Sequence, residues 1–117
     1  MQEGRKVRLQ SLIQEEISRI IPREIKDPRV KALTITQVDM SPDGSHVTVY
    51  FTLFGRLEEE GDDVRECTAG LTSAAPFIRR HLAKTLTVKH IPALTFKQDK
   101  GFLNALKIEE LLRKVKQ

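Results

Sequence analysis

The chain has 117 residues, of which 39% are hydrophobic and 31% charged, and its formal net charge at pH 7 is +4. This length allows one domain with a substantial hydrophobic core, and the composition excludes collagen-like, low-complexity and fully disordered chains. No apolar run is long enough for a transmembrane helix or a secretory signal, so we expect neither. The single cysteine, Cys67, excludes an intrachain disulfide and favours the reducing cytoplasm.

Charge is distributed unevenly along the chain. Residues 1–32 hold eight Lys or Arg and five Asp or Glu. Residues 67–117 hold ten Lys or Arg and three Asp or Glu. The middle, residues 33–66, holds only two Lys or Arg but eight Asp or Glu. Such segregation favours one surface that attracts phosphates, although an ordinary solvated surface with an acidic loop fits the same counts.

The first element is an amphipathic helix predicted over residues 5–21. Its apolar residues recur at spacings of three and four and therefore share one stripe: Leu9, Leu12, Ile13, Ile17, Ile20 and Ile21. Pro22 is expected to end or kink the helix, because proline lacks the backbone N–H. Asp27-Pro28 then predicts a turn before an extended segment.

Two strands follow, predicted over residues 33–40 and 46–54. Residues 33–40 are rich in β-branched side chains, and residues 46–54 alternate between apolar and polar. Between them, residues 41–45 contain Pro42 and Gly44, which suit a tight turn. The pair is therefore predicted to form an antiparallel hairpin with one buried face.

An acidic loop is predicted over residues 55–63, with Asp62 and Asp63 capping the helix that follows. That helix is predicted over residues 63–74. Since proline is tolerated in the first turn of a helix but not in its interior, Pro76 predicts a break and a further helix to about residue 86.

The last elements are a short strand over residues 94–98 and a tail helix over residues 103–115. The resulting order is α-β-β-α-α-β with a tail helix, which a mixed three-stranded sheet with helices on one face satisfies. We expect the apolar residues of the tail helix to pack onto the domain rather than to bind a partner.

Residues suited to catalysis are few. The chain contains no phosphate-binding glycine motif, and His46, His81 and His90 have no zinc-ligand spacing with Cys67. Cys67 lies on an apolar helix stripe and is predicted to be a buried structural residue. Three aspartates near strand ends could gather a magnesium ion, but such residues are more often turn formers and caps. They are Asp39, Asp43 and Asp99.

Cations after the predicted break form the main candidate for binding a phosphate backbone. Arg79, Arg80 and Lys84 belong to the predicted helix, and Lys89 follows it. A second basic patch consists of Arg5, Lys6 and Arg8. Aromatic residues are few, so we expect recognition of backbone and shape more than base stacking. The alternative interpretation of these cations is that they belong to a solvent-facing helix and bind no ligand.

The sequence also resembles the ribosome-binding factor A family over nearly its whole length. The resemblance begins with Arg5-Lys6-Val7, Glu15-Glu16-Ile17-Ser18 and Ile25-Lys26-Asp27-Pro28-Arg29. It continues through the segments 33–43 and 47–51, then Phe77-Ile78-Arg79-Arg80, the segment 91–96 and Asp99. The order and spacing of these pieces together make the resemblance specific.

The resemblance implies a type II KH-like domain over residues 1–100, followed by a basic amphipathic tail over residues 101–117. The family lacks the G-x-x-G loop of KH domains and carries an Ala-x-Gly kink between two helices. The matching residues here are Ala74-Ala75-Pro76, with proline where the family has glycine. Proline can break a helix, but it cannot supply positive φ or the close backbone approach of glycine.

The function implied by the resemblance is binding of the free, immature 30S ribosomal subunit at 16S rRNA, near the 5′ end and the decoding region. The protein would assist late maturation and 5′-end processing, and the family is associated with cold adaptation. We expect no catalysis, cofactor, metal or membrane, a monomeric state, and contacts with other small-subunit assembly factors. The alternatives are a generic RNA-binding KH-like adaptor, a small metal-dependent nuclease, and a protein adaptor acting through the tail.

Overall fold

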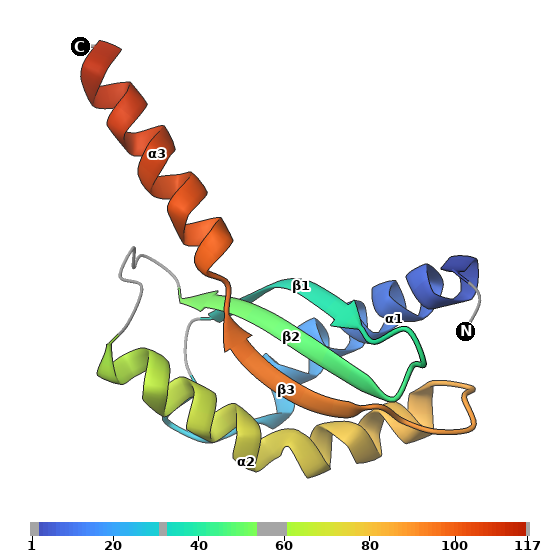
Figure 1. The fold of residues 1–117 in the computed structure, drawn as a ribbon. Coiled ribbons are helices and arrows are strands. Elements are labelled where there is room, and N and C mark those ends of the chain that lie inside the picture. Colours follow the sequence, from blue (N-terminus) through green and yellow to red (C-terminus); the bar gives the residue numbers. More distant parts are fainter. Residues whose placement is uncertain (1–2, 31–32, 54–60, 117) are drawn as a thin grey trace.

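A computed structural model describes residues 3–30, 33–53 and 61–116 of the chain (Figure 1). The elements follow the order α1 (Glu3–Glu24), β1 (Leu33–Met40), β2 (His46–Leu53), α2 (Asp62–Thr85), β3 (Ala93–Gln98) and α3 (Lys100–Lys116). The predicted α+β, KH-like class with a three-stranded mixed sheet is confirmed. Most of the acidic loop predicted at residues 55–63, and the end of the strand predicted at 46–54, lie outside the described residues.

The sheet has the order β1-β2-β3, so β2 is its central strand. β1 pairs antiparallel with β2 through the predicted turn, where Gly44 has φ 75°. β3 pairs parallel with β2, which requires a crossover connection, and α2 supplies it. An irregularity between Ile35 and Gln37 leaves Thr36 outside the regular pairing of β1 with β2.

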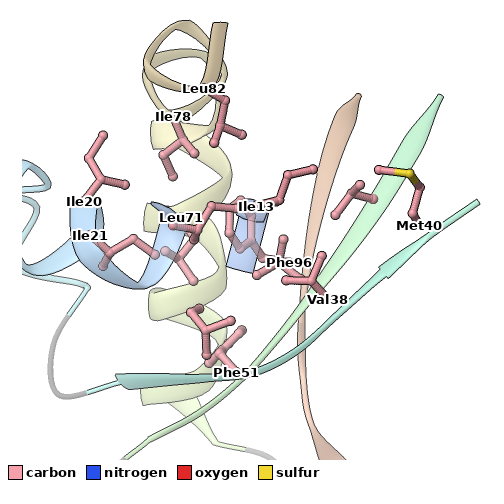
Figure 2. Packing of buried hydrophobic residues seen from close by; sticks show 14 of the residues in the cluster. Ile13, Ile20, Ile21, Val38, Met40, Phe51, Leu71, Ile78, Leu82 and Phe96 are labelled. Carbon is pink, nitrogen blue, oxygen red and sulfur yellow. The ribbon is translucent and has the colours of Figure 1, made fainter. Parts of the chain in front are cut away.

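The hydrophobic core lies between the sheet and the two helices that cover one of its faces, α1 and α2 (Figures 1 and 2). The alternation of β2 places Val47, Val49 and Phe51 in this core, all with no exposed surface. The opposite face of β2 carries Thr48 and Tyr50, which are half-buried. Cys67 is buried, as predicted.

α1 buries the predicted stripe except at Leu12, which is exposed. The helix continues through Pro22 to Glu24 instead of ending before the proline. Pro22 lies in the last turn, where the missing N–H removes only one hydrogen bond, and Ile25 N–H still donates to Ile21 O at 3.2 Å.

The two helices predicted over residues 63–74 and 76–86 form one helix, α2, with Pro76 inside it. The prediction that Pro76 interrupts the helix is therefore wrong. The two halves of α2 nevertheless run in different directions in Figure 1. Proline removes one backbone hydrogen bond, but buried residues on both sides of it hold the two halves against the sheet. Those residues are Cys67, Leu71, Ile78 and Leu82.

The N-terminus of α2 also differs from the prediction. Asp62 and Asp63 lie in the first turn, while Gly61 is the N-cap residue and makes no side-chain cap hydrogen bond. The aspartates can still stabilise the helix, because negative charge is favourable near its N-terminus.

The connector between α1 and β1 crosses α2 at Gly70. A Cβ atom at Gly70 would lie 2.7 Å from Cγ2 of Val30 and 3.3 Å from Cβ of Arg29. Asp27 shapes the connector by accepting hydrogen bonds from the backbone N–H and guanidinium of Arg29. The same hydrogen bonds lower the pKa of Asp27 to about 2, so this carboxylate is ionised at neutral pH.

Gly70→Ala is expected to lower the free energy of unfolding, as measured by urea denaturation. Overpacking costs about 1–3 kcal/mol, whereas alanine gains about 1 kcal/mol over glycine inside a helix. The branched side chain of Val30 has few rotamers with which to move away. In a Val30→Ala background the loss should be much smaller, because the methyl group at 2.7 Å is gone and only the contacts at 3.3 Å remain. A Gly70→Ala protein more stable than the parent would show that the connector yields freely.

α3 departs most from the prediction, because it projects away from the domain instead of packing onto it (Figure 1). Five of its large apolar side chains are exposed, from 41% at Phe102 to 81% at Val115, with Ile108, Leu111 and Leu112 between these values. The start of α3 is fixed by Asp99, which accepts hydrogen bonds from Phe102 N–H at 2.9 Å and Thr36 Oγ1 at 2.6 Å. The tail is therefore attached at its first turn and is not held by burial of its apolar face.

Candidate nucleic-acid interface

The face of α2 that points away from the sheet carries the predicted cations. Arg80 and Lys84 are exposed there, and they are four residues apart, which places them side by side on the helix surface. Helical spacing adds Ser73, Pro76 and Phe77 to the same face, and these are exposed as well. The face thus combines two cations with small side chains and one aromatic ring.

Arg79 is placed differently from its neighbour Arg80. Its Nε donates to Pro92 O at 3.0 Å, and its Nη2 donates to Ile91 O at 3.0 Å. These bonds tie α2 to the connector that leads into β3. Arg79 therefore has a structural contact that the sequence did not predict, since its acceptors are backbone carbonyls.

Lys89 lies in the connector between α2 and β3 and is exposed. Because Arg79 holds the end of this connector, the position of Lys89 depends on that contact. The bonds of Arg79 to Ile91 and Pro92, 12 and 13 residues further along the chain, thus close the segment that carries Lys89.

α1 and α2 are joined by a polar contact near the same cations. Nε2 of His81 lies 3.1 Å from Oε2 of Glu16, and Arg19 Nη2 contacts both oxygens of the same carboxylate at 2.7 Å. The hydrogen bond that Glu16 accepts from Arg19, followed by the one it accepts from His81, lowers the pKa of Glu16. Glu16 is therefore kept ionised between the two helices.

The second basic patch lies in the first turns of α1, where Arg5 and Arg8 are exposed and Lys6 is half-buried. In Figure 1, α1 and α2 run in opposite directions. The N-terminal end of α1 and the C-terminal end of α2 thus lie at the same end of the molecule (Figure 1).

The aspartates considered for a metal site do not form a cluster within the described residues, where no group of three or more His, Cys, Asp or Glu could hold an ion. Asp43 accepts hydrogen bonds from Ser45 N–H and the hydroxyls of Ser41 and Ser45 in the hairpin turn. These bonds, led by that from Ser45 N–H, lower the pKa of Asp43 to about 2. Asp39 accepts from Gln37, and Asp99 caps α3. Each carboxylate thus has a local structural role.

Sequence reasoning missed three features of this region: the exposure of Phe77, the Glu16–His81 contact and the backbone contacts of Arg79. A signal for Phe77 was present, because Ser73, Phe77, Arg80 and Lys84 recur at spacings of four, three and four residues. The other two are contacts between distant segments, for which a single sequence carries no pattern.

Of the described helices, none is sufficiently long and apolar to cross a membrane.

The fold and the exposed basic face together define a small KH-like α+β domain with a candidate polyanion-binding helix. The chain belongs to the ribosome-binding factor A family, whose model matches residues 5–112. It is 38% identical to ribosome-binding factor A of Thermomicrobium roseum over 117 residues, covering 100% of this chain and 88% of the relative. It is 40% identical to ribosome-binding factor A of Oenococcus oeni over 112 residues, covering 96% of this chain and 90% of the relative.

Solved structures agree with this assignment. The crystal structure of ribosome-binding factor A from Thermus thermophilus matches with a TM-score of 0.69 at 25% identity, over 80% of this chain and 93% of that one. The solution structure of a Thermotoga maritima protein described as a putative ribosome binding factor A matches with a TM-score of 0.71 at 29% identity, over 86% and 92%. A homology model of the Thermus protein, fitted into the cryo-EM map of its complex with the 30S subunit, matches with a TM-score of 0.61 at 27% identity, over 80% and 93%.

Proposed function

We propose that this protein binds the free, immature 30S ribosomal subunit through 16S rRNA, and that it assists late maturation and 5′-end processing of that RNA in the cytoplasm. The observation that carries the proposal is membership of the ribosome-binding factor A family across residues 5–112. The 30S complex of the Thermus thermophilus relative supports the choice of subunit.

The proposed RNA-binding residues are Arg79, Arg80, Lys84 and Lys89, with Arg5, Lys6 and Arg8 as the second patch. Their cations would neutralise rRNA phosphates and release bound counterions, which makes affinity depend on salt. The bend of α2 around Ala74, Ala75 and Pro76 would set the orientation of the helix on the RNA. Arg79 would contribute mainly by holding the connector that carries Lys89.

The proposed mechanism is selection of one rRNA conformation and not catalysis. A protein that binds one conformer more tightly shifts the equilibrium toward it by that difference in affinity. No cofactor or metal takes part in the proposal, and the protein acts as a monomer, alone or beside other small-subunit assembly factors. A generic RNA-binding adaptor would have the same surface but no preference for the 30S subunit.

Sucrose-gradient cosedimentation with purified small subunits, large subunits and assembled ribosomes, at low and moderate salt, tests the proposal. We expect selective comigration with free small subunits that persists at moderate salt. Equal binding to all three particles, lost at moderate salt, would reduce the protein to a non-specific polycation. Cleavage of labelled RNA by the pure protein only with a divalent cation would instead support the nuclease alternative.

We further propose that residues 1–100 form the binding domain and residues 101–117 an appended basic amphipathic tail. Deleting residues 101–117 is expected to change the free energy of unfolding by less than about 0.5 kcal/mol, because the buried core consists of residues between Leu9 and Phe96. Thermal unfolding followed by circular dichroism measures this. A melting temperature lower by several degrees would show that the tail stabilises the domain after all.

A further inference from the structure

We propose that Phe77 is a stacking platform for an unpaired nucleobase, beside Arg80 and Lys84 on the exposed face of α2. The inference deepens the proposed RNA binding and rests on it. It also adds to the recognition expected from sequence, which involved only backbone and shape. The ligand class is a nucleotide in a single-stranded segment of rRNA, because bases within an RNA duplex have no face available for stacking.

The exposure of Phe77 is the first observation. Aromatic rings are usually buried, and the domain follows this rule at Phe51 and Phe96, which are 0% and 3% exposed. Phe77 is 39% exposed although it lies on a helix packed against the sheet. The neighbouring residue Ile78 faces the core with no exposed surface, so Phe77 lies on the side of α2 that faces solvent.

The surroundings of the ring fit a nucleotide. Arg80 and Lys84 follow Phe77 by three and seven residues, about one and two helical turns along the same face. Ser73 precedes it by four residues on that face, and Pro76 and Ala83 add only small side chains beside it. A base could therefore lie on the ring while its neighbouring phosphates meet the cations.

The helix that carries the ring is held rigidly on both sides. Arg79 is bonded to the carbonyls of Ile91 and Pro92 on one side, and His81 contacts Glu16 of α1 on the other. With Ile78 in the core, the residues around Phe77 are fixed before any ligand arrives. Such preorganisation reduces the entropy lost on binding, which suits a recognition surface.

The test compares Phe77→Leu and Phe77→Trp, using a single-stranded RNA oligonucleotide and a duplex RNA with the same number of phosphates. Phe77→Leu should weaken single-strand binding about tenfold, since stacking on an aromatic ring contributes about that much or more per base. Duplex binding and the slope of log affinity against log salt should not change, because no cation is removed. Phe77→Trp should retain the affinity of the parent.

Phe77→Trp also reports on stacking directly, because the natural chain contains no tryptophan. Its fluorescence should be quenched strongly by the single strand and weakly by the duplex. Phe102→Leu and Phe102→Trp are matched controls, since Phe102 is 41% exposed but lies on the projecting tail. Both control variants should bind single strands like the parent, and the fluorescence of the Phe102→Trp variant should show little quenching.

Several outcomes would overturn the stacking role. Unchanged single-strand affinity of Phe77→Leu, or an equal loss for single strand and duplex, would contradict it. Weaker small-subunit binding by Phe77→Leu with unchanged affinity for both RNAs would point to a protein contact instead. If the unmodified protein failed to comigrate selectively with small subunits, the proposed function would fail, whereas the oligonucleotide results would still decide the role of Phe77.

Discussion

Phe51→Ala is expected to lower the free energy of unfolding by about 3–5 kcal/mol, the cost of removing a buried aromatic side chain and leaving a cavity. Phe51 lies on the central strand β2 with no exposed surface, between the sheet and the covering helices (Figure 2). Since small domains have only about 5–15 kcal/mol of stability in total, the variant should unfold at a much lower urea concentration. Chemical denaturation followed by circular dichroism measures the change.

Tyr50→Ala provides the control for this experiment. It removes a ring from the adjacent residue, which is half-buried on the opposite face of the same strand. The expected loss is about 1 kcal/mol, mainly from strand propensity and partial burial. Equal losses for Phe51→Ala and Tyr50→Ala would mean that both faces of the sheet are covered in solution, contrary to the structure.

The combined substitution Arg80→Glu and Lys84→Glu is expected to weaken binding to small subunits more than tenfold at low salt. Each cation is expected to make one charge-assisted contact with a phosphate, a bond that contributes about 1.5–3 kcal/mol. The slope of log affinity against log salt should fall by about one for each cation removed. Cosedimentation titrations at several salt concentrations measure both quantities.

The control for charge alone is the pair Arg23→Glu and Lys97→Glu, which changes the net charge by the same amount. Arg23 lies in the last turn of α1 and Lys97 on β3, and both are exposed. This variant should bind small subunits with only a modest loss. A loss as large as that of the α2 variant would mean that the total charge, and not the basic face of α2, determines affinity. Arg79 is left unchanged in both proteins because it supports the connector to β3.

Local patterns predicted the strands and most of the core well. The strand at residues 33–40 has its predicted bounds, and the alternation predicted from residue 46 is observed, with Val47, Val49 and Phe51 buried on one face. These predictions succeeded because side chains alternate between the two faces of a strand, and one face here is covered. The turn between the strands was predictable because Pro42 and Gly44 restrict the backbone locally.

The placement of the candidate cations could be predicted only in part, and their role in RNA binding stays a prediction. Charge and helical spacing indicated Arg80 and Lys84, which are exposed on α2. The same reasoning placed Arg79 with them, but its guanidinium contacts carbonyls of the following connector. The sequence shows that an arginine can donate hydrogen bonds. It does not show whether the acceptor is a phosphate of a ligand or a carbonyl of the same chain.

The sequence by itself determined the α+β class, the hairpin, the buried stripe of α1 and the basic character of α2, because each follows from the spacing of neighbouring residues. Only the tertiary structure decided that α2 continues through Pro76, since burial on both sides of the proline compensates for its lost hydrogen bond. It also decided that α3 projects outward. An amphipathic pattern shows that a helix has an apolar face, but only the arrangement of the other elements determines whether the domain covers that face.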